Sequence, residues 1–339
     1  MGGNQSRLES ALLSPDKYAL SPKARYFGFE NFGNTCFCNS VLQALFHCAP
    51  FRQRIRSYRT DVLTPPTCLL TCLANLFDSI CRHKHRTGVI APETFMRRLR
   101  KSNDLFATGM QQDAHEFLNF LLNDISEKAL QIDRSRNEAD GNHGNKSFVQ
   151  ELFEGVLTNE TRCLCCESVT SRDECFLDLS VDIVQNSSIA HCFENFSAVE
   201  RLGGDDKFFC DGCNMLQEAR KSMHVKHAPP VLVVHLKRFK YVEEFQCHKK
   251  LSHRVAFPLE FRLKESSHGA AGSSVLYSLS AVVVHRGTGP NSGHYLCYVL
   301  SESNWLLFND DVIELVDIEH IQACFGAASE ASGGGNHTG

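Results

Sequence analysis

Apolar residues in the first half of the chain recur every three or four positions, which is the spacing of an amphipathic helix. One such stripe covers residues 37–46. A longer stripe predicts a helix over residues 113–130, with a capping signal in residues 108–111 just before it. Residues 131–147 are polar and contain glycines, so we expect an exposed loop after this helix.

In the second half of the chain the apolar runs become shorter. Residues 229–236 and 279–285 have the length and composition of buried strands. At the ends, we expect residues 1–25 to form a flexible arm and the small, glycine-rich residues 326–339 a disordered tail. Residues 26–325 are then expected to form a single large domain with subdomains.

The composition is that of an ordinary globular protein, with 42% hydrophobic and 22% charged residues. The formal net charge of −4 gives no electrostatic footprint for DNA or RNA, so we expect no nucleic-acid partner. The basic run at residues 97–101 is interpreted as the solvated face of a helix.

The chain has no apolar run near the roughly 20 residues that span a bilayer, and no secretory segment opens it. We therefore expect a cytoplasmic or nuclear protein, in which the 16 cysteines are free, metal-bound or catalytic rather than paired in disulfides. A membrane location is one alternative, because Gly2 fits the pattern for N-myristoylation. A single myristoyl chain would give only weak membrane association.

Cys36 stands between a polar, glycine-containing segment and the start of the first apolar helix. Unpaired N–H groups and the helix dipole favour negative charge in a first turn. A cysteine placed there, beside a histidine, has a lowered pKa and reacts as a thiolate. Cys36 is therefore the candidate nucleophile.

A candidate base, His294, lies far downstream in a strand-like segment. A second strand-like segment follows at residues 305–308. If the two strands are adjacent, Asn309 or Asp310 can reach His294 and fix its tautomer, as the third residue of a Cys/His/Asn or Cys/His/Asp site does. We prefer Asn309 as the direct partner, with Asp310 assisting. The alternative is that Asp310 bonds to His294 and Asn309 caps a turn.

Two Cys-x-x-Cys pairs stand in the strand-rich middle, Cys163 with Cys166 and Cys210 with Cys213. Four thiolates satisfy a closed tetrahedral zinc site, whatever the length of chain between the pairs. The plain alternative is two chance pairs among many cysteines. A closed site of four thiolates leaves no open position for chemistry, so the predicted Zn²⁺ is structural.

The segments around Cys36 and His294, together with residues 111–117 and 236–239, match in residue and order those of ubiquitin-specific proteases. The resemblance extends from about residue 26 to about residue 325. It implies an α+β fold, a papain-like cysteine protease with a helical thumb (about 26–145), β fingers stapled by zinc (about 146–235) and a β-rich palm (about 236–325).

The resemblance also implies roles for individual residues. Asn31 aligns with the family's side-chain donor to the oxyanion. Gln111 and Asp113 are expected to hold the ubiquitin tail, although their segment is also a plain helix start. Tyr295 either lines the tail channel or faces the core. The reaction implied is thiol-dependent hydrolysis of isopeptide bonds at the C-terminal glycine of ubiquitin.

Within that family the chain is similar to the short subgroup that WD-repeat propeller proteins activate. Ubiquitin, ubiquitinated proteins and a WD-repeat activator are therefore the expected partners. Two other functions are considered: a catalytically weak ubiquitin-binding scaffold, and a protease for a ubiquitin-like modifier. The intact set of Cys36, His294 and Asn31 argues against the scaffold.

Overall fold

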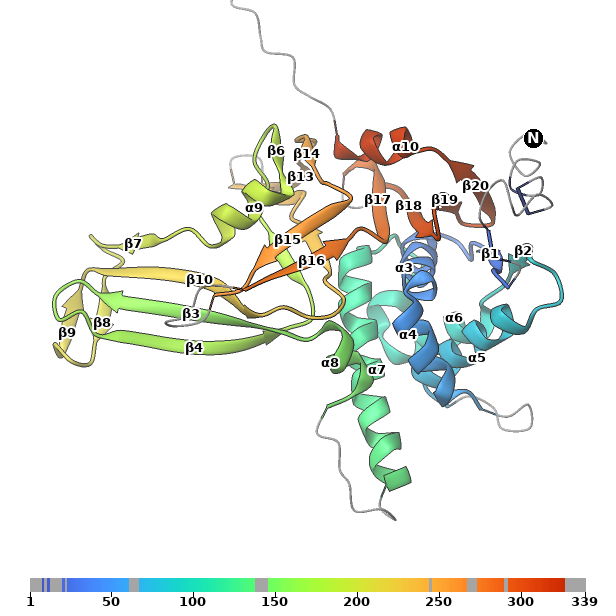
Figure 1. Ribbon diagram of the computed structural model, residues 1–339, viewed down its shortest axis with the longest axis horizontal. Coiled ribbons are helices and arrows are strands. Elements are labelled where there is room, and N and C mark those ends of the chain that lie inside the picture. Colours follow the sequence, from blue (N-terminus) through green and yellow to red (C-terminus); the bar gives the residue numbers. More distant parts are fainter. Residues whose placement is uncertain are drawn as a thin grey trace, which may run out of the picture.

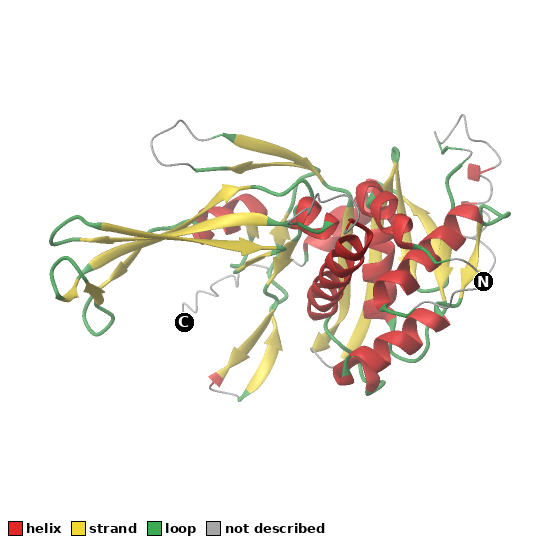
Figure 2. Cartoon of the chain, turned by 90° about the horizontal axis from the view of Figure 1, so that it is seen from below, coloured by secondary structure: helices red, strands yellow, loops and turns green. Residues whose placement is uncertain are grey.

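The computed structural model describes residues 8, 11–12, 20–21, 23–60, 67–137, 146–243, 246–266, 273–289 and 292–326. A body of helices and a sheet lies at one end of the molecule, and long strands project from it (Figures 1 and 2). The predicted mixture of helices and strands, with helices first, is confirmed. Among the described residues, no helix has both the length and the apolar character needed to cross a membrane.

Helices pack around one core in the first half of the chain. They are α3 (Cys36–His47), α4 (Ala49–Ile55), α5 (Leu69–Arg82), α6 (Glu93–Ser102), α7 (Ala114–Asn137) and α8 (Phe148–Phe153), with short 3-10 turns η1 (Arg56–Tyr58) and η2 (Asp104–Ala107). Aromatic rings join them: the ring of Phe37 in α3 meets the edge of the Phe117 ring in α7 at 5.4 Å between centroids. Helix α8 belongs to this core through Phe148 and Phe153, although its residues lie in the range expected for the fingers.

Helix α7 is longer than the polar sequence indicated. The expected loop over residues 131–147 is wrong for its first part, because the helix continues to Asn137. Its last turns have partners: the Tyr58 hydroxyl donates to Asp133, and the Arg136 guanidinium lies over the Tyr58 ring. The helix start also differs, since the side chain of Asp113, rather than residues 108–111, accepts from the first free N–H groups.

A four-stranded sheet forms the projecting part, with the order β4 (Val169–Phe176), β3 (Gly155–Cys163), β10 (Ala219–His227) and β7 (Glu200–Leu202). At its tip, β8 (Phe208–Cys210) and β9 (Met215–Gln217) form a separate hairpin. Strand β4 is exposed along nearly its whole length. We call this projecting part the fingers. Buried apolar side chains pack against its sheet mainly at the base.

A second four-stranded sheet, the palm sheet, lies against α3 (Figure 1). Its order is β17 (Ala281–Gly289), β18 (Ser292–Ser301), β19 (Asn304–Asn309) and β20 (Val312–Val316), all antiparallel. Alternate residues of β18 face opposite sides, so Cys297 joins one core cluster and Leu296 another. The strand predicted over residues 279–285 is confirmed as the start of β17.

Shorter elements connect these parts. Strand β1 (Tyr26–Phe29) pairs in parallel with β2 (Thr87–Ile90), and β11 (Val234–Leu236) pairs in parallel with β5 (Leu179–Val181). Only the end of the strand predicted over residues 229–236 is therefore a strand. The remaining elements are β6 (Ser187–Ser188), α9 (Ile189–Phe196), β12 (Phe239–Val242), β13 (Cys247–Lys250), β14 (Val255–Ala256), β15 (Glu260–Lys264), β16 (Ser274–Ser278), α10 (Ile318–Gln322) and η4 (Ala323–Phe325).

Both predicted termini fall largely outside the described residues. In the expected flexible arm, residues 8, 11–12, 20–21 and 23–25 are described, and of these Leu8, Ala11 and Leu20 are buried in one cluster with residues of the palm sheet. These three residues are therefore packed rather than loose. Gly2 with its myristoylation pattern, and the expected disordered tail beyond Gly326, lie outside the described residues.

Candidate active site and metal centre

Cys36 is the first residue of α3, as the sequence predicted, and its side chain is buried at 2% exposure. The loop between β1 and α3 turns through Gly33 and Asn34, both with positive φ. The side-chain oxygen of Asn31 closes this loop by accepting from the Thr35 N–H at 3.1 Å. The polar residues before Cys36 therefore fold the chain into a tight turn that delivers the thiol to the helix start.

The thiol of Cys36 is less acidic than expected. Burial raises the pKa of Cys36, and the Asp310 carboxylate adds to the rise, while the backbone N–H of Tyr295 lowers it and offsets only part of the change. The prediction of a lowered pKa is therefore wrong for the protein alone. Removing a thiolate from water outweighs the favourable field of the helix start.

His294 and Asn309 meet across the antiparallel strands β18 and β19. His294 Nε2 lies 2.7 Å from Asn309 Oδ1, and 3.8 Å from Asp310 Oδ2. An amide oxygen only accepts hydrogen bonds, so Nε2 carries the proton in this pair and Nδ1 is left with a lone pair. Asn309 therefore has the geometry of the direct partner, and Asp310 lies just beyond hydrogen-bond distance.

Two asparagine side chains donate hydrogen bonds to the Asp310 carboxylate. Asn31 Nδ2 donates to Asp310 Oδ2 at 2.8 Å, and Asn39 Nδ2 donates to Asp310 Oδ1 at 2.8 Å. Asn39, which is buried at 2% exposure one turn after Cys36, was missed. A polar residue on the buried face of an apolar helix was the signal that could have found it. The carboxylate thus joins the Cys36 loop, helix α3 and the end of β19.

The backbone around Asp310 also contacts strand β1. The Phe29 N–H donates to the Asp310 carbonyl at 2.9 Å. Next to it, Gly28 packs so closely that an added Cβ would lie 2.5 Å from the Asp311 carbonyl oxygen. Only glycine fits at this contact. The strand that leads into the Cys36 loop and the turn that follows Asn309 are therefore fixed to each other.

Cys36 and His294 lie on facing elements, because α3 packs on β18 and the Tyr295 backbone next to His294 acts on the Cys36 thiol. Among the described residues, no hydrogen bond joins the Cys36 sulfur to His294. Bonds of this kind are often long in a free enzyme and tighten when substrate binds.

The residues expected around a ubiquitin tail also gather here. Gln111 Nε2 donates to the carbonyl of Gly293, which joins the thumb to the segment that carries His294. The Tyr295 side chain is buried, and its burial and the Asp113 carboxylate raise the pKa of its hydroxyl. Asp113 therefore has two contacts, with the start of α7 and with Tyr295.

Lys250 is a further polar residue near this site that the sequence did not single out. Its ammonium donates to three acceptors on β17: His285 Nδ1 at 3.0 Å, the His285 carbonyl at 2.7 Å and the Gly287 carbonyl at 3.0 Å. Burial and this cation lower the pKa of His285 to about 4, so its ring is neutral at physiological pH. The contact fixes the β12–β13 hairpin to the strand that precedes His294.

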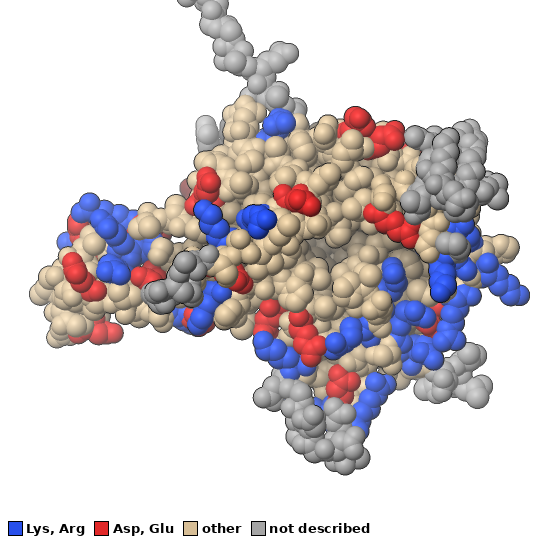
Figure 3. Space-filling view, viewed as in Figure 1, with Lys and Arg blue, Asp and Glu red and all other residues tan. Residues whose placement is uncertain are grey.

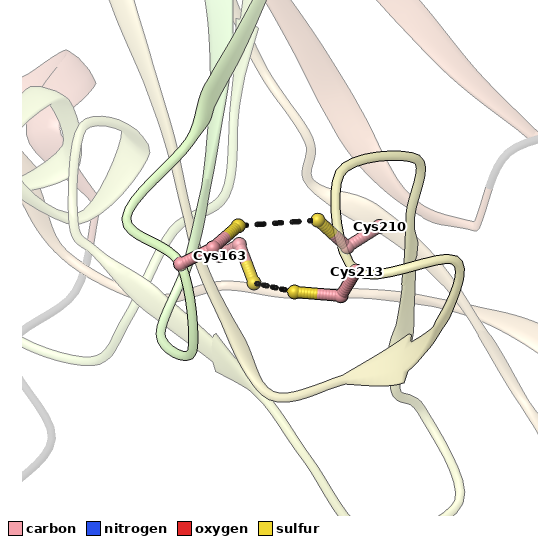
Figure 4. Close-up of side chains that lie close together, drawn as sticks. Cys163, Cys210 and Cys213 are labelled. Carbon is pink, nitrogen blue, oxygen red and sulfur yellow. Dashed lines mark hydrogen bonds between the residues drawn. The ribbon is translucent and has the colours of Figure 1, made fainter.

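The four cysteines of the two Cys-x-x-Cys pairs meet at the tip of the fingers (Figure 4). Their sulfur atoms all lie within 4.8 Å of one another, with Cys163 and Cys213 at 4.0 Å and Cys166 and Cys210 at 3.6 Å. A tetrahedral site with Zn–S distances of about 2.3 Å has sulfur-to-sulfur edges of about 3.8 Å. The cluster therefore fits a metal ion of that size, and the adjacent Cys165 lies outside it.

Known proteins resemble the chain over nearly its whole length. Residues 27–331 match the family described as ubiquitin carboxyl-terminal hydrolase. "Ubiquitin carboxyl-terminal hydrolase 4" of Arabidopsis thaliana is 50% identical, covering 99% of this chain and 97% of the relative. "Ubiquitin carboxyl-terminal hydrolase 12" of Salmo salar is also 50% identical, covering 98% of this chain and 92% of the relative.

Solved structures of a similar shape include the SAGA deubiquitinating module. Its Ubp8/Sgf11/Sus1/Sgf73 assembly bound to ubiquitin aldehyde matches with a TM-score of 0.76 and 27% identity, over 96% of this chain and 75% of that one. A second structure of the module, bound to monoubiquitin, matches with a TM-score of 0.73 and 27% identity, over 96% of this chain and 74% of that one.

Proposed function

Because this chain belongs to the ubiquitin carboxyl-terminal hydrolase family, and is thus a cysteine-type deubiquitinase, we propose that Cys36 hydrolyses the isopeptide bond between the ubiquitin C-terminal glycine and a lysine of the conjugated protein. The observation that carries this assignment is the meeting of three segments at one place: the Asn31 loop with the start of α3, His294 on β18, and Asn309 with Asp310 at the end of β19.

The proposed reaction has two steps. His294 takes the proton of the Cys36 thiol through Nδ1, and the sulfur attacks the glycine carbonyl carbon. The C–N bond then breaks, the lysine amine leaves with the proton from His294, and ubiquitin remains bound to Cys36 as a thioester. A water molecule, deprotonated by His294, attacks the thioester, and the thiol is regenerated as ubiquitin leaves with a free carboxylate.

Asn31 and the Cys36 backbone N–H are the proposed donors to the oxyanion of both steps. One N–H of the Asn31 amide is bonded to Asp310, which orients the amide and leaves its second N–H for the substrate. A preorganised donor of this kind contributes about 10²–10³ in rate. Gln111, Asp113 and Tyr295 are the proposed contacts of the extended ubiquitin tail.

We assign a structural Zn²⁺ to the cysteine cluster of the fingers, with Cys163, Cys166, Cys210 and Cys213 as ligands. The proposal is supported by the spacing of the sulfur atoms and by the exposure of strand β4 along nearly its whole length. When bound, the ion supplies cross-linking and no chemistry. These residues would fix the ends of two hairpins, so that the fingers present one rigid surface to ubiquitin.

A WD-repeat propeller that docks on the fingers is the proposed activator. The tip exposes apolar side chains that a partner could cover: Phe209, Met215 and Leu216 are 51%, 55% and 59% exposed. The raised pKa of Cys36 supports a low turnover for the protein alone. Cytoplasm and nucleus remain the proposed locations, with membrane association only if Gly2 is myristoylated.

The test is reaction with ubiquitin that carries a C-terminal electrophile, followed by intact mass. We expect one ubiquitin adduct on the native chain and none on the Cys36→Ala variant. The same electrophile on ubiquitin-like modifiers serves as the specificity control. A modifier-only adduct would assign the enzyme to that modifier, and the absence of every adduct, even with a propeller present, would favour the ubiquitin-binding scaffold.

A further inference from the structure

A groove lies beside the loop that leads to Cys36. Its volume is about 390 Å³, and it is lined by Phe32, Glu93, Met96, Arg97, Arg100 and Lys101. We propose that this groove binds an acidic segment of the protein to which ubiquitin is attached. The proposal rests on the proposed deubiquitinase function and adds a recognition site for the leaving protein.

The lining combines positive charge with an apolar floor. The side chains of Arg97, Arg100 and Lys101 are exposed on α6, and none of the three has an acidic partner among the ion pairs of the described residues. Phe95 and Leu99 are buried and anchor α6 to the core, and the buried Met96 forms part of the floor of the groove. The sequence indicated only a solvated helix face here; the groove shows that these cations border a concave surface.

The position of the groove points to the leaving protein rather than to ubiquitin. Phe32 is the neighbour of Asn31, and Arg100 Nη2 donates to the Phe32 carbonyl at 3.2 Å. Helix α6 lies on the other side of α3 from the fingers (Figure 1). If ubiquitin rests against the fingers and its tail ends at Cys36, the conjugated protein extends toward α6.

Charge complementarity identifies the partner as an acidic peptide segment. Lys and Arg side chains gather over this part of the thumb, although the chain as a whole has a net charge of −4 (Figure 3). Carboxylates pair with arginine and lysine, and apolar side chains of a peptide can rest on the half-buried Phe32. A nucleic-acid backbone is less well supported, because the chain as a whole has a net charge of −4 and so no general electrostatic attraction for DNA or RNA.

The experiment compares three ubiquitin conjugates that differ only in the leaving group: a small fluorescent amine, a lysine peptide rich in glutamate, and the same peptide with glutamine at those positions. The variant is Arg97→Glu with Lys101→Glu; Arg100 is kept because it bonds to the Cys36 loop. The matched control is Lys84→Glu with Arg134→Glu, which makes the same change of charge at exposed positions outside the groove.

For the native protein at low salt, we expect the glutamate peptide to have a kcat/KM about three- to tenfold above the glutamine peptide. The groove variant should lose this preference and keep its rate on the fluorescent amine, and the control should keep both. Added salt should reduce the preference of the native protein.

Equal rates on the two peptides would overturn the groove proposal, while release of the fluorescent amine would leave the proposed function standing. No release from any conjugate, with or without an activator, would instead reject the proposed function. A random DNA duplex that inhibits the native protein and the control, but not the groove variant, would reassign the groove to nucleic acid.

Discussion

The catalytic centre and the fingertip are held together in different ways. In the catalytic centre, Asn31, Asn39 and Asp310 are joined by hydrogen bonds beside a large helical core. At the fingertip, two short turns bring four sulfur atoms together, with Ser168 Oγ 3.5 Å from Cys210 Sγ, and the neighbouring side chains of Phe209 and Leu216 are exposed. The first region is ordered by packing, and for the second we propose a metal cross-link.

The two regions should therefore fail independently. Asp310 accepts from two amides, so the loss of either one leaves a carboxylate oxygen without its donor. At the fingertip, strand β4 is exposed along nearly its whole length, so the order of the tip should depend on whether the proposed metal is bound. A variant in one region should leave the other region intact.

Replacing Cys210 by serine should disorder the fingertip, because structural zinc contributes about 10–16 kcal/mol of apparent binding energy. We expect loss of bound zinc by elemental analysis and a fall of at least about tenfold in kcat/KM on ubiquitin conjugates. Alkylation of Cys36 by iodoacetamide should be unchanged. Cys165→Ser is the matched control, and an equal loss of zinc in that variant would contradict the ligand assignment.

Asn309→Ala should slow turnover about 10- to 100-fold, because it removes the acceptor that orients His294. Asn309→Asp keeps an acceptor at the same place and should retain most of the activity. The measurement is kcat with a ubiquitin–fluorophore conjugate, with thermal unfolding to check the fold. Full activity of the Asn309→Ala variant would indicate that Asp310, rather than Asn309, orients His294.

Asn39→Ala should lower kcat by up to about tenfold and destabilise the protein by about 1–3 kcal/mol, because Asp310 loses one of its two amide donors. Asn39→Asp should be worse, since two carboxylates would then face each other. Denaturant unfolding and kcat measured on both variants test this order. If the aspartate variant were the better enzyme, Asn39 would not support Asp310 as described.

The smallest effect concerns the pH dependence of Cys36. Because burial raises its pKa, the thiolate fraction of the free protein is small at neutral pH and increases with alkali. The rate of alkylation by iodoacetamide should therefore keep rising above pH 9, the range of an ordinary thiol. If the alkylation rate instead reached a plateau below pH 7, the pKa of Cys36 would be low, as the sequence suggested, and the effect assigned to burial would be contradicted.

Periodic patterns predicted the elements that carry the site better than the contacts between them. The helix after Cys36 and the strand predicted over residues 279–285, which is the start of β17, follow from the local pattern, which needs no knowledge of the partner. The extension of α7 to Asn137 does not, because Tyr58 stabilises its last turns from a distant segment. Tertiary contacts of this kind override local polarity.

The chemistry of the site was predictable in its residue types and less so in its energetics. Cys36 was found from its place at the start of an apolar helix, and His294 with Asn309 from their adjacent strand-like segments; the family resemblance then supported all three. The raised pKa of Cys36 was missed because burial is a property of the folded core. Asn39 was missed for the same reason, since only the fold brings Asp310 to it.

The close fit of Gly28 against Asp311 has a consequence for the folding of the protein. The two residues belong to segments that are separated by the helices, the fingers and most of the palm sheet, so the entropy of closing a very long loop opposes their contact. A fragment that lacks strands β17 to β20 leaves strand β1 without this partner. We therefore expect the loop before Cys36 to become ordered only when the palm sheet has formed.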